Sequence, residues 1–431
     1  MVTIKHKYIL YLVFWIALVQ GIFQGYLHFS QITYLCDVLL IILLFLYLNE
    51  KHEITIDELH KTTLFFLPVA AFILVILIGW MINDTSVASA LWGTRNYFRF
   101  FLYFALCLAY MDKSDARLMA DWLVNLFPLH LLITAFQYIV QNLNGDYLGG
   151  IFGTQQGCNG GLVIYLGLLF CIMLIRYESG ECSLIRFLIY LLCIFANAAA
   201  SELKAFYVFA AILALIFLVL SRKKWKSIFI ILIIGVVIII GFQILYYFFP
   251  SWSGYFQLSN LTKIFADASS GYSNSEDISR TTVFSRLTPI IRNWNGNQCD
   301  LWFGIGLGNA DYSTTFKWLN GPFYLQYNRL HYIWLSTACL FIETGYLGLA
   351  CYTGFFLFIA VRVIRKYCKT GDTVDLMGIL ITLFCFMLMF YDASLRSNYA
   401  YIIFAALSWP FLNSPGEEEG ELTEEQQDLN D

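Results

Sequence analysis

Long runs of apolar residues alternate with short polar segments along most of this chain. A helix needs about 20 apolar residues to cross a membrane. By that measure we expect spans at about 8–28, 30–48, 63–82, 96–110, 120–140, 160–176, 184–200, 205–221, 227–249, 334–361, 375–391 and 398–412. The tenth is long, and we expect its first turns to lie in the interface or to re-enter. The pattern predicts an all-α polytopic membrane protein with about twelve transmembrane helices.

The polar segments divide the chain into four parts. We expect a bundle of the first nine spans at 1–249, a large loop at 250–330, the last three spans at 331–412 and a tail at 413–431. The loop contains fifteen aromatic residues, which a flexible linker would not carry, so it predicts a folded cap outside the membrane. The tail holds eight acidic residues and no Lys or Arg, which is typical of a disordered, solvated segment.

Composition supports a membrane protein and excludes other classes. The 431 residues are 59% hydrophobic and only 13% charged, whereas soluble domains carry about 25% charged residues. This excludes a soluble globular protein, a disordered chain, a disulfide-stapled scaffold and a nucleic-acid binder with a basic face. The eleven cysteines are scattered without a C-x-x-C motif and read as buried apolar residues, although a bridge between Cys158 and Cys299 is left open.

The positions of the cations orient the spans. Sixteen of the 26 Lys and Arg residues border loops on one side when the N-terminus is placed inside. Because such residues gather on the cytoplasmic side, both termini are expected to be cytoplasmic and the large loop to face outward. The acidic tail is then cytoplasmic as well.

Several cations are left near the outer face, and most of them are arginines. Arg presents a fork of donors that suits phosphate oxygens, so we expect an anion-binding group here, with contacts to lipid headgroups as the alternative. The candidates are Arg95, Lys204, Arg280 and Arg286. Arg280 ranks first because it is expected to begin a loop helix, and Arg286 ranks second. Glu202 could simply neutralise Lys204.

Two further features concern chemistry. His331 ends the loop just before a span and could act as a general base, although a lone histidine is more often structural. The run Gly304-Ile305-Gly306-Leu307-Gly308 lacks a nucleotide-binding context and favours close backbone packing in the cap. No D-x-D motif and no outward cluster with metal-ligand spacing occurs in the sequence, so we expect no metal and no cofactor.

Four stretches, in this order, resemble the bacterial family of O-antigen polymerases and O-antigen ligases. They are Gly150-Ile151-Phe152-Gly153-Thr154, Ser201-Glu202-Leu203-Lys204, Ser279-Arg280 with Phe284 and Leu301 to Gly308, and His331 with Leu335 and Glu343 to Gly348. The match covers roughly residues 90–365. In this chain Tyr332 stands where the family usually has Asn, and Lys204 stands for the commoner Arg.

The resemblance implies a metal-independent membrane glycosyltransferase of the bacterial inner membrane. Its donor and acceptor would be glycans linked to undecaprenyl pyrophosphate, and a chain-length regulator and a flippase are possible partners. His331 and Arg280 would be catalytic, and Arg280, Lys204, Arg286 and Arg95 would bind pyrophosphate. Trp294 and Trp302 could stack on sugars. We favour a polymerase of O-antigen, capsule or exopolysaccharide; the alternatives are an O-antigen ligase acting on lipid A–core and a polysaccharide transporter or flippase.

Overall fold

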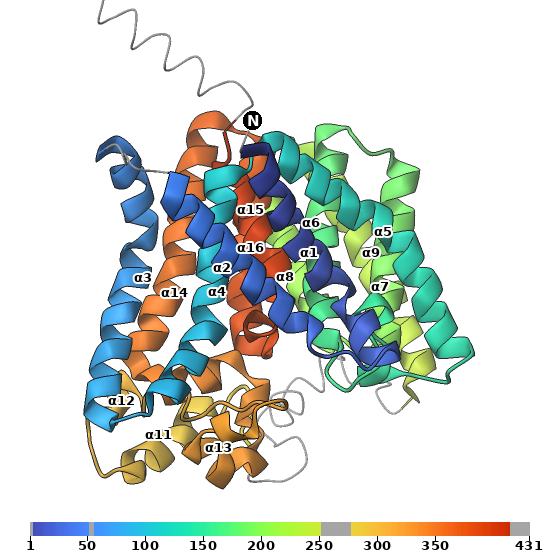
Figure 1. Cartoon of the computed structure of the whole chain (residues 1–431). Coiled ribbons are helices and arrows are strands. Elements are labelled where there is room, and N and C mark those ends of the chain that lie inside the picture. The colour runs from blue at the N-terminus through green and yellow to red at the C-terminus, as the bar shows by residue number, and fades with distance from the viewer. Residues whose placement is uncertain (1–2, 51–55, 251–276, 414–431) are drawn as a thin grey trace, which may run out of the picture.

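The computed structural model describes residues 3–50, 56–250 and 277–413, and all regular elements in these ranges are helices. The first group runs from the N-terminus to the large loop (Figure 1): α1 Thr3–Tyr26, α2 Ile32–Glu50, α3 Ile56–Asn83, α4 Val87–Tyr110, α5 Lys113–Ile139, α6 Asn159–Ser179, α7 Leu184–Ala200, α8 Lys204–Leu220 and α9 Lys224–Phe248. The second group comprises α11 Val283–Trp294, α12 Asp300–Phe303, α13 Pro322–Tyr327, α14 Ser336–Thr370, α15 Thr373–Tyr391 and α16 Ala400–Ser408. The predicted acidic tail beyond residue 413 and the loop residues 251–276 lie outside the described residues.

Eight of the described helices are long and apolar enough to cross a membrane, and they make the chain a helical multi-pass membrane protein. They lie in α1, α2, α3, α5, α6, α9, α14 and α15. Three shorter apolar helices, Leu184–Ala200, Lys204–Leu220 and Ala400–Phe411, also fall where spans are expected. The count of twelve spans stays a prediction.

Helix α4 is longer and more polar than expected. Its predicted span was 96–110, but the helix begins at Val87, where the Ser86 side chain accepts a hydrogen bond from the Ser89 amide. The early turns lie outside the predicted span because Arg95 interrupts the apolar pattern there, whereas Arg99 falls inside that span. Both arginines lie next to Asp37 of α2, so their charge is matched inside the bundle.

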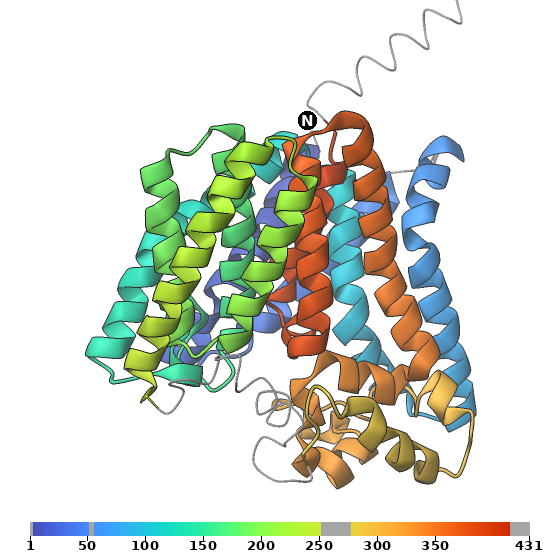
Figure 2. The same cartoon turned by 180° about the vertical axis from the view of Figure 1, so that it is seen from behind.

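The cap lies at one end of the bundle. Helices α11, α12 and α13 gather at the end opposite the N-terminus, which we call the cap end (Figures 1 and 2). Along α11, Val283, Leu287 and Ile291 are spaced one turn apart and all are buried. We expected one or two helices here, with Pro289 starting the second. A single helix forms, because Pro289 and Ser285, whose carbonyl loses its partner, both face solvent.

The core of the cap continues beyond residue 330. Its buried cluster includes Leu335, Ala338, Phe341 and Ile342, which belong to the start of α14 or directly precede it. Helix α14 is broken at Gly345, where φ is 65° and ψ is −165°. We therefore define the cap as residues 277–344. The long tenth span is thus two helical segments, the first packed in the cap and the second running along the bundle.

The glycine run fixes the cap to two helices. A side chain at Gly304 would overlap the backbone of Glu343, and one at Gly308 would overlap the carbonyl of Ser89. The Gly308 amide also donates a 2.9 Å hydrogen bond to Oε1 of Glu343. The prediction of close backbone packing is confirmed, and the partners are the α14 break and the first turn of α4.

Candidate functional site

Arg280 lies at the junction of the cap with the membrane bundle. It precedes α11 rather than beginning it, and its side chain is exposed. Its Nε donates a 2.7 Å hydrogen bond to the carbonyl of Tyr391, the last residue of α15. The guanidinium also stacks over the Tyr391 ring, 4.5 Å from the ring centroid. These contacts hold the cation at the end of α15 that lies next to the cap.

His331 directly follows the short helical turn Asn328–Leu330 and is paired with a carboxylate. Its Nδ1 lies 3.0 Å from Oδ1 of Asp277, which is buried. The ring stacks on Trp334, with centroids 4.2 Å apart and an angle of 20° between the planes. The His331 side chain is 26% exposed. A buried carboxylate on one ring nitrogen orients the imidazole and leaves the other nitrogen to act on a substrate.

Two hydrogen bonds to the backbone hold the segment that carries Asp277. Nη1 of Arg286 donates a 3.0 Å hydrogen bond to the Asp277 carbonyl, and the Ile278 amide donates to the carbonyl of Leu330. Arg286 therefore braces the turn that carries both Asp277 and Arg280. The chain passes from Asp277 to Arg280 in three residues, so His331 and Arg280 are positioned by one short segment.

Lys204 enters the same region from the turn between α7 and α8. Its Nζ lies 2.8 Å from Oε1 of Glu202, so the ion pair considered from the sequence is present. Glu202 has a φ of 58°, in the left-handed region that non-glycine residues seldom adopt. Arg280 is close enough to Lys204 for the two positive charges to repel each other. The lysine is only 25% exposed at its side chain.

Asp392 is a carboxylate of this region that the sequence reasoning missed. Its Oδ1 accepts hydrogen bonds from the amide and the hydroxyl of Ser394. Its backbone carbonyl accepts one from the Ser336 amide at 3.0 Å, which ties it to the start of α14. Burial raises the pKa of Asp392 to about 6, while the Ser394 hydrogen bonds and the charge of Arg280 act in the opposite direction. We call Asp277, Arg280, Lys204, His331 and Asp392 the vestibule.

An apolar groove leads to the vestibule along the side of the bundle. Its volume is about 490 Å³, and it lies between α8 and α15 with Arg280 among its lining residues. The apolar residues that line it are Ala205, Val208, Phe209, Ile212, Phe386, Met387, Phe390 and Tyr391. Because Val208 and Phe390 are both 49% exposed, the groove is open to the side rather than enclosed. It offers an apolar path that ends at a cation.

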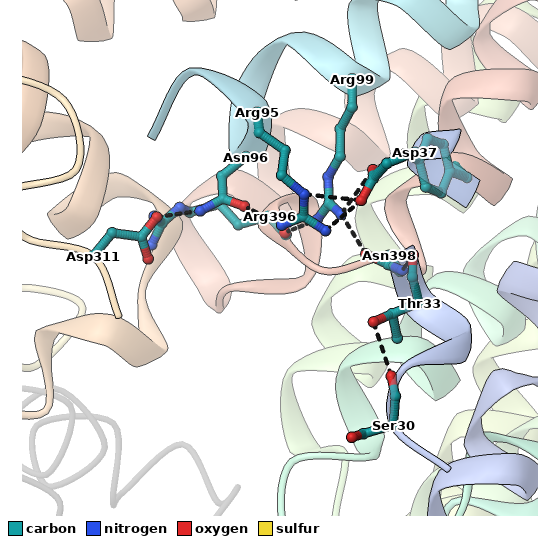
Figure 3. A network of polar contacts seen from close by, with 10 residues as sticks. Ser30, Thr33, Asp37, Arg95, Asn96, Arg99, Asp311, Arg396 and Asn398 are labelled. Atoms are coloured by element: carbon teal, nitrogen blue, oxygen red, sulfur yellow. Dashed lines mark hydrogen bonds and ion pairs between the residues drawn. The ribbon is translucent and has the colours of Figure 1, made fainter. Parts of the chain in front are cut away.

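Arg95 belongs to a second charged cluster, in which it contacts Asp37 (Figure 3). Its Nε donates a 2.8 Å hydrogen bond to Asp37, and its guanidinium lies between the rings of Tyr34 and Trp92. Arg99 contacts Asp37 at 3.6 Å and Asn398 at 2.5 Å. We call this cluster, which continues through Arg396 to Asp311 and Glu343, the buried network. Arg95 is therefore assigned to helix packing, and its predicted pyrophosphate role gains no support from the geometry.

The two tryptophans predicted to bind sugars occupy different environments. Trp294 packs in the cap against Phe323 and Tyr327, at centroid distances of 5.2 and 6.0 Å. Trp302 is 56% exposed and packs against Tyr346 beside the α14 break. Trp334, which was not singled out from the sequence, is 38% exposed and stacks directly on His331.

Two further predictions concern a disulfide bridge and metal ligands. Cys158 is buried, Cys299 is exposed, and both are free thiols, so the bridge left open between them is not formed. Among residues 3–50, 56–250 and 277–413, no three His, Cys, Asp or Glu side chains lie close enough to hold a metal ion.

Comparison of the chain with known proteins finds no match to a protein-family model and none to a curated protein. The class defined by the fold is a helical multi-pass membrane protein with a folded cap at one end. The resemblance to O-antigen polymerases and ligases stays a prediction.

Proposed function

We propose that the chain is a membrane glycosyltransferase that polymerises oligosaccharide repeat units carried on undecaprenyl pyrophosphate. The observation that carries the proposal is the apolar groove between α8 and α15 that ends at Arg280. A polyprenyl chain needs an apolar surface open to the bilayer, and its pyrophosphate needs cations at headgroup level. The groove and the vestibule provide both within one continuous region.

The residues of the vestibule suit a displacement at the anomeric carbon. A hydroxyl of the acceptor sugar attacks that carbon, and its proton passes to Nε2 of His331, whose Nδ1 faces Asp277. The bond from the anomeric carbon to the phosphate oxygen breaks, and the electron pair leaves with the pyrophosphate. Arg280, with Lys204 nearby, stabilises the charge that develops on the leaving group. Trp334 would stack on a sugar face next to the histidine.

A transporter remains the alternative from another class, and the buried polar groups bear on it. Transporters place functional polar groups between helices near the middle of the membrane. Here His130 of α5 contacts the Asn197 amide of α7 at 3.1 Å, and Asp37 contacts Arg95. Both groups are satisfied by neighbouring helices, which favours packing roles, whereas Arg280 of the vestibule is exposed.

The proposal also assigns a membrane and an orientation. The chain would lie in the bacterial cytoplasmic membrane with both termini in the cytoplasm, so the cap and vestibule would face outward. A flippase would deliver the lipid-linked repeat units to that face, and a chain-length regulator could act on the same complex. Membrane lipid surrounds the bundle, and no nucleic acid is involved.

The test is polymer synthesis by the purified full chain in detergent with EDTA present. The lipid-linked repeat unit of the source organism is supplied, and a ladder of oligomers is expected. Arg280→Ala should lower the rate by about 10²–10³-fold, the range found when a donor to a developing oxyanion is removed. Arg292→Ala, which removes an exposed arginine from the last turn of α11, serves as the control and should retain the rate.

Three other outcomes would change the assignment. Transfer only when lipid A–core is added would identify a ligase. Equal ladders from the Arg280→Ala and Arg292→Ala proteins would remove Arg280 from the site. Absence of product with either acceptor, from a protein that carries repeat units across vesicle membranes, would identify a transporter.

A further inference from the structure

A second cavity lies at the opposite end of the bundle from the cap. It is formed where α5 begins, α6 ends and α7 begins, near the N-terminal end of the molecule (Figure 1). Its volume is about 400 Å³. The residues lining it are Arg117, Asp121, Met173, Arg176, Glu181, Cys182 and Arg186. Three guanidiniums and two carboxylates thus surround a space between three helices.

The charges of this cavity are only partly matched. Arg117 pairs with Glu181 at 3.2 Å, and Arg176 pairs with Asp121 at 2.6 Å. For Arg186 no ion pair with a carboxylate occurs among the described residues, and its guanidinium lies 5.6 Å from the centroid of the Tyr190 ring. The lining therefore carries one more positive than negative charge. One monoanionic phosphate group would balance it, and Arg binds phosphate through paired donors.

The surface beside the cavity is apolar and exposed. Leu118 follows Arg117 on α5 and is 39% exposed, while Ile185 precedes Arg186 on α7 and is 72% exposed. Ile189, one turn further along α7, is 55% exposed. The cavity is thus polar at the helix ends, and the helix faces beside it, toward the middle of the bundle, are apolar. This arrangement matches that of a phospholipid, in which a polar headgroup is joined to apolar acyl chains.

We infer that the cavity between α5, α6 and α7 binds the headgroup of an anionic phospholipid, with Arg186 as the residue that supplies its unmatched charge. Basic pockets between transmembrane helices are known to hold such headgroups. The lipid would hold the starts of α5 and α7 together on the membrane side away from the vestibule. This site is independent of the proposed glycosyl transfer.

The experiment measures lipid retention by the purified full chain in detergent, using native mass spectrometry with added phosphatidylglycerol or phosphatidylcholine. Wild-type protein is expected to retain phosphatidylglycerol preferentially. Arg186→Ala should weaken its binding about fivefold, which corresponds to the roughly 1 kcal/mol that one basic residue contributes near an anionic headgroup. Arg186→Lys keeps the charge and should retain most of the binding.

The control is Arg362→Ala, which removes an arginine toward the C-terminal end of α14, over the Phe358 ring and outside the cavity. It should bind phosphatidylglycerol as the wild type does, and both variants should give the same yield of monodisperse protein. The inference fails if the Arg186→Ala and Arg362→Ala proteins bind the lipid equally. It also fails if phosphatidylcholine binds as tightly as phosphatidylglycerol, or if inorganic phosphate displaces the lipid at equal concentration, which would indicate a site for a soluble anion.

Discussion

The vestibule and the buried network are both built from charged residues at the cap end, but they differ in how far their charges are paired and buried. In the network, Arg95, Arg99 and Arg396 lie within a chain of contacts to Asp37, Asp311 and Glu343. Three guanidiniums meet three carboxylates, and the Arg99 and Arg396 side chains are only 7% and 10% exposed. In the vestibule, Arg280 is exposed and contacts a backbone carbonyl and a ring.

The difference indicates two uses of the same residue type. Charges that are buried and matched in number join helices, because separating them would leave a carboxylate or a guanidinium unsolvated. Charges that are exposed at the end of an apolar groove can exchange water for a ligand. The network therefore holds α2, α4 and the α15–α16 turn together. The vestibule is the part that can bind a ligand. The following predictions separate these uses, beginning with the largest expected effect.

His331→Ala should lower the rate of glycan transfer by about 10²–10⁴-fold, the range typical of a positioned general base. Asp277→Asn should reduce the rate by a smaller factor, because the histidine remains but loses its orienting carboxylate. The measurement is the initial rate with lipid-linked repeat units. His28→Ala, at an exposed position in the α1–α2 turn, is the matched control and should have no effect on the rate. Equal rates for the His331→Ala and His28→Ala proteins would remove the base from the mechanism.

Arg396→Ala should destabilise the folded protein by about 3–5 kcal/mol, since it leaves two buried carboxylates, Asp311 and Glu343, without their cation. Thermal unfolding in detergent, followed by tryptophan fluorescence, would show a lowered Tm or a loss of monodisperse protein. Arg280→Ala should leave the Tm close to that of the wild type. If both substitutions lowered the Tm equally, the distinction between the network and the vestibule would be wrong.

Gly308→Ala should cost about 1–3 kcal/mol, because the new methyl group overlaps the Ser89 carbonyl and the residue has a φ of 81°. Gly296 has a φ of 69° but nothing within 4 Å of an added side chain, so Gly296→Ala isolates the backbone strain from the overlap. The difference between the two Tm values reports the packing of the cap on α4. A difference near zero would mean that the glycine run is not held against that helix.

Asp392→Asn should have the smallest effect, and it should depend on pH. Because the pKa of Asp392 is raised to about 6 in the folded protein, the native state binds its proton more tightly than the unfolded state does. Ionisation of this carboxyl therefore lowers stability as pH rises from about 4 to 6. The variant should match the wild type at pH 4 and be more stable at pH 8. If the Tm values of the wild type and of Asp392→Asn changed in parallel between pH 4 and pH 8, the raised pKa of Asp392 would be wrong.

Hydropathy predicted the positions of the helices well but not their interruptions. The apolar patterns of α7 and α8 were placed within a residue of their observed limits. The start of α4 was missed because Arg95 counts against a span unless its partner on α2, Asp37, is known. The break in α14 was missed because the sequence does not distinguish Gly345 from the other glycines. Its positive φ and its close contact with the backbone of Trp302 and Gly304 are seen only in the structure.

The candidate site was predicted in part. Arg280, Lys204 and His331 were selected as outward charges next to spans, and the structure brings Arg280 into the range of Lys204. Asp277 and Asp392 were missed, since their partners lie far away in the sequence: His331 is 54 residues from Asp277. The signal available for Asp392 was its position two residues before Ser394, in a short turn between two apolar segments. Such spacing indicates a turn but does not place it beside Arg280.

The broken helix α14 has a consequence for the order in which the protein is assembled. The core of the cap draws on Leu335, Ala338, Phe341 and Ile342, which are synthesised after every other part of the cap. A nascent chain that ends at residue 330 lacks these side chains, so the buried cluster that contains Val283, Leu287 and Ile291 would be incomplete. Cap folding therefore has to wait until the first segment of α14 has emerged, and the membrane segment that follows Gly345 is inserted at nearly the same moment.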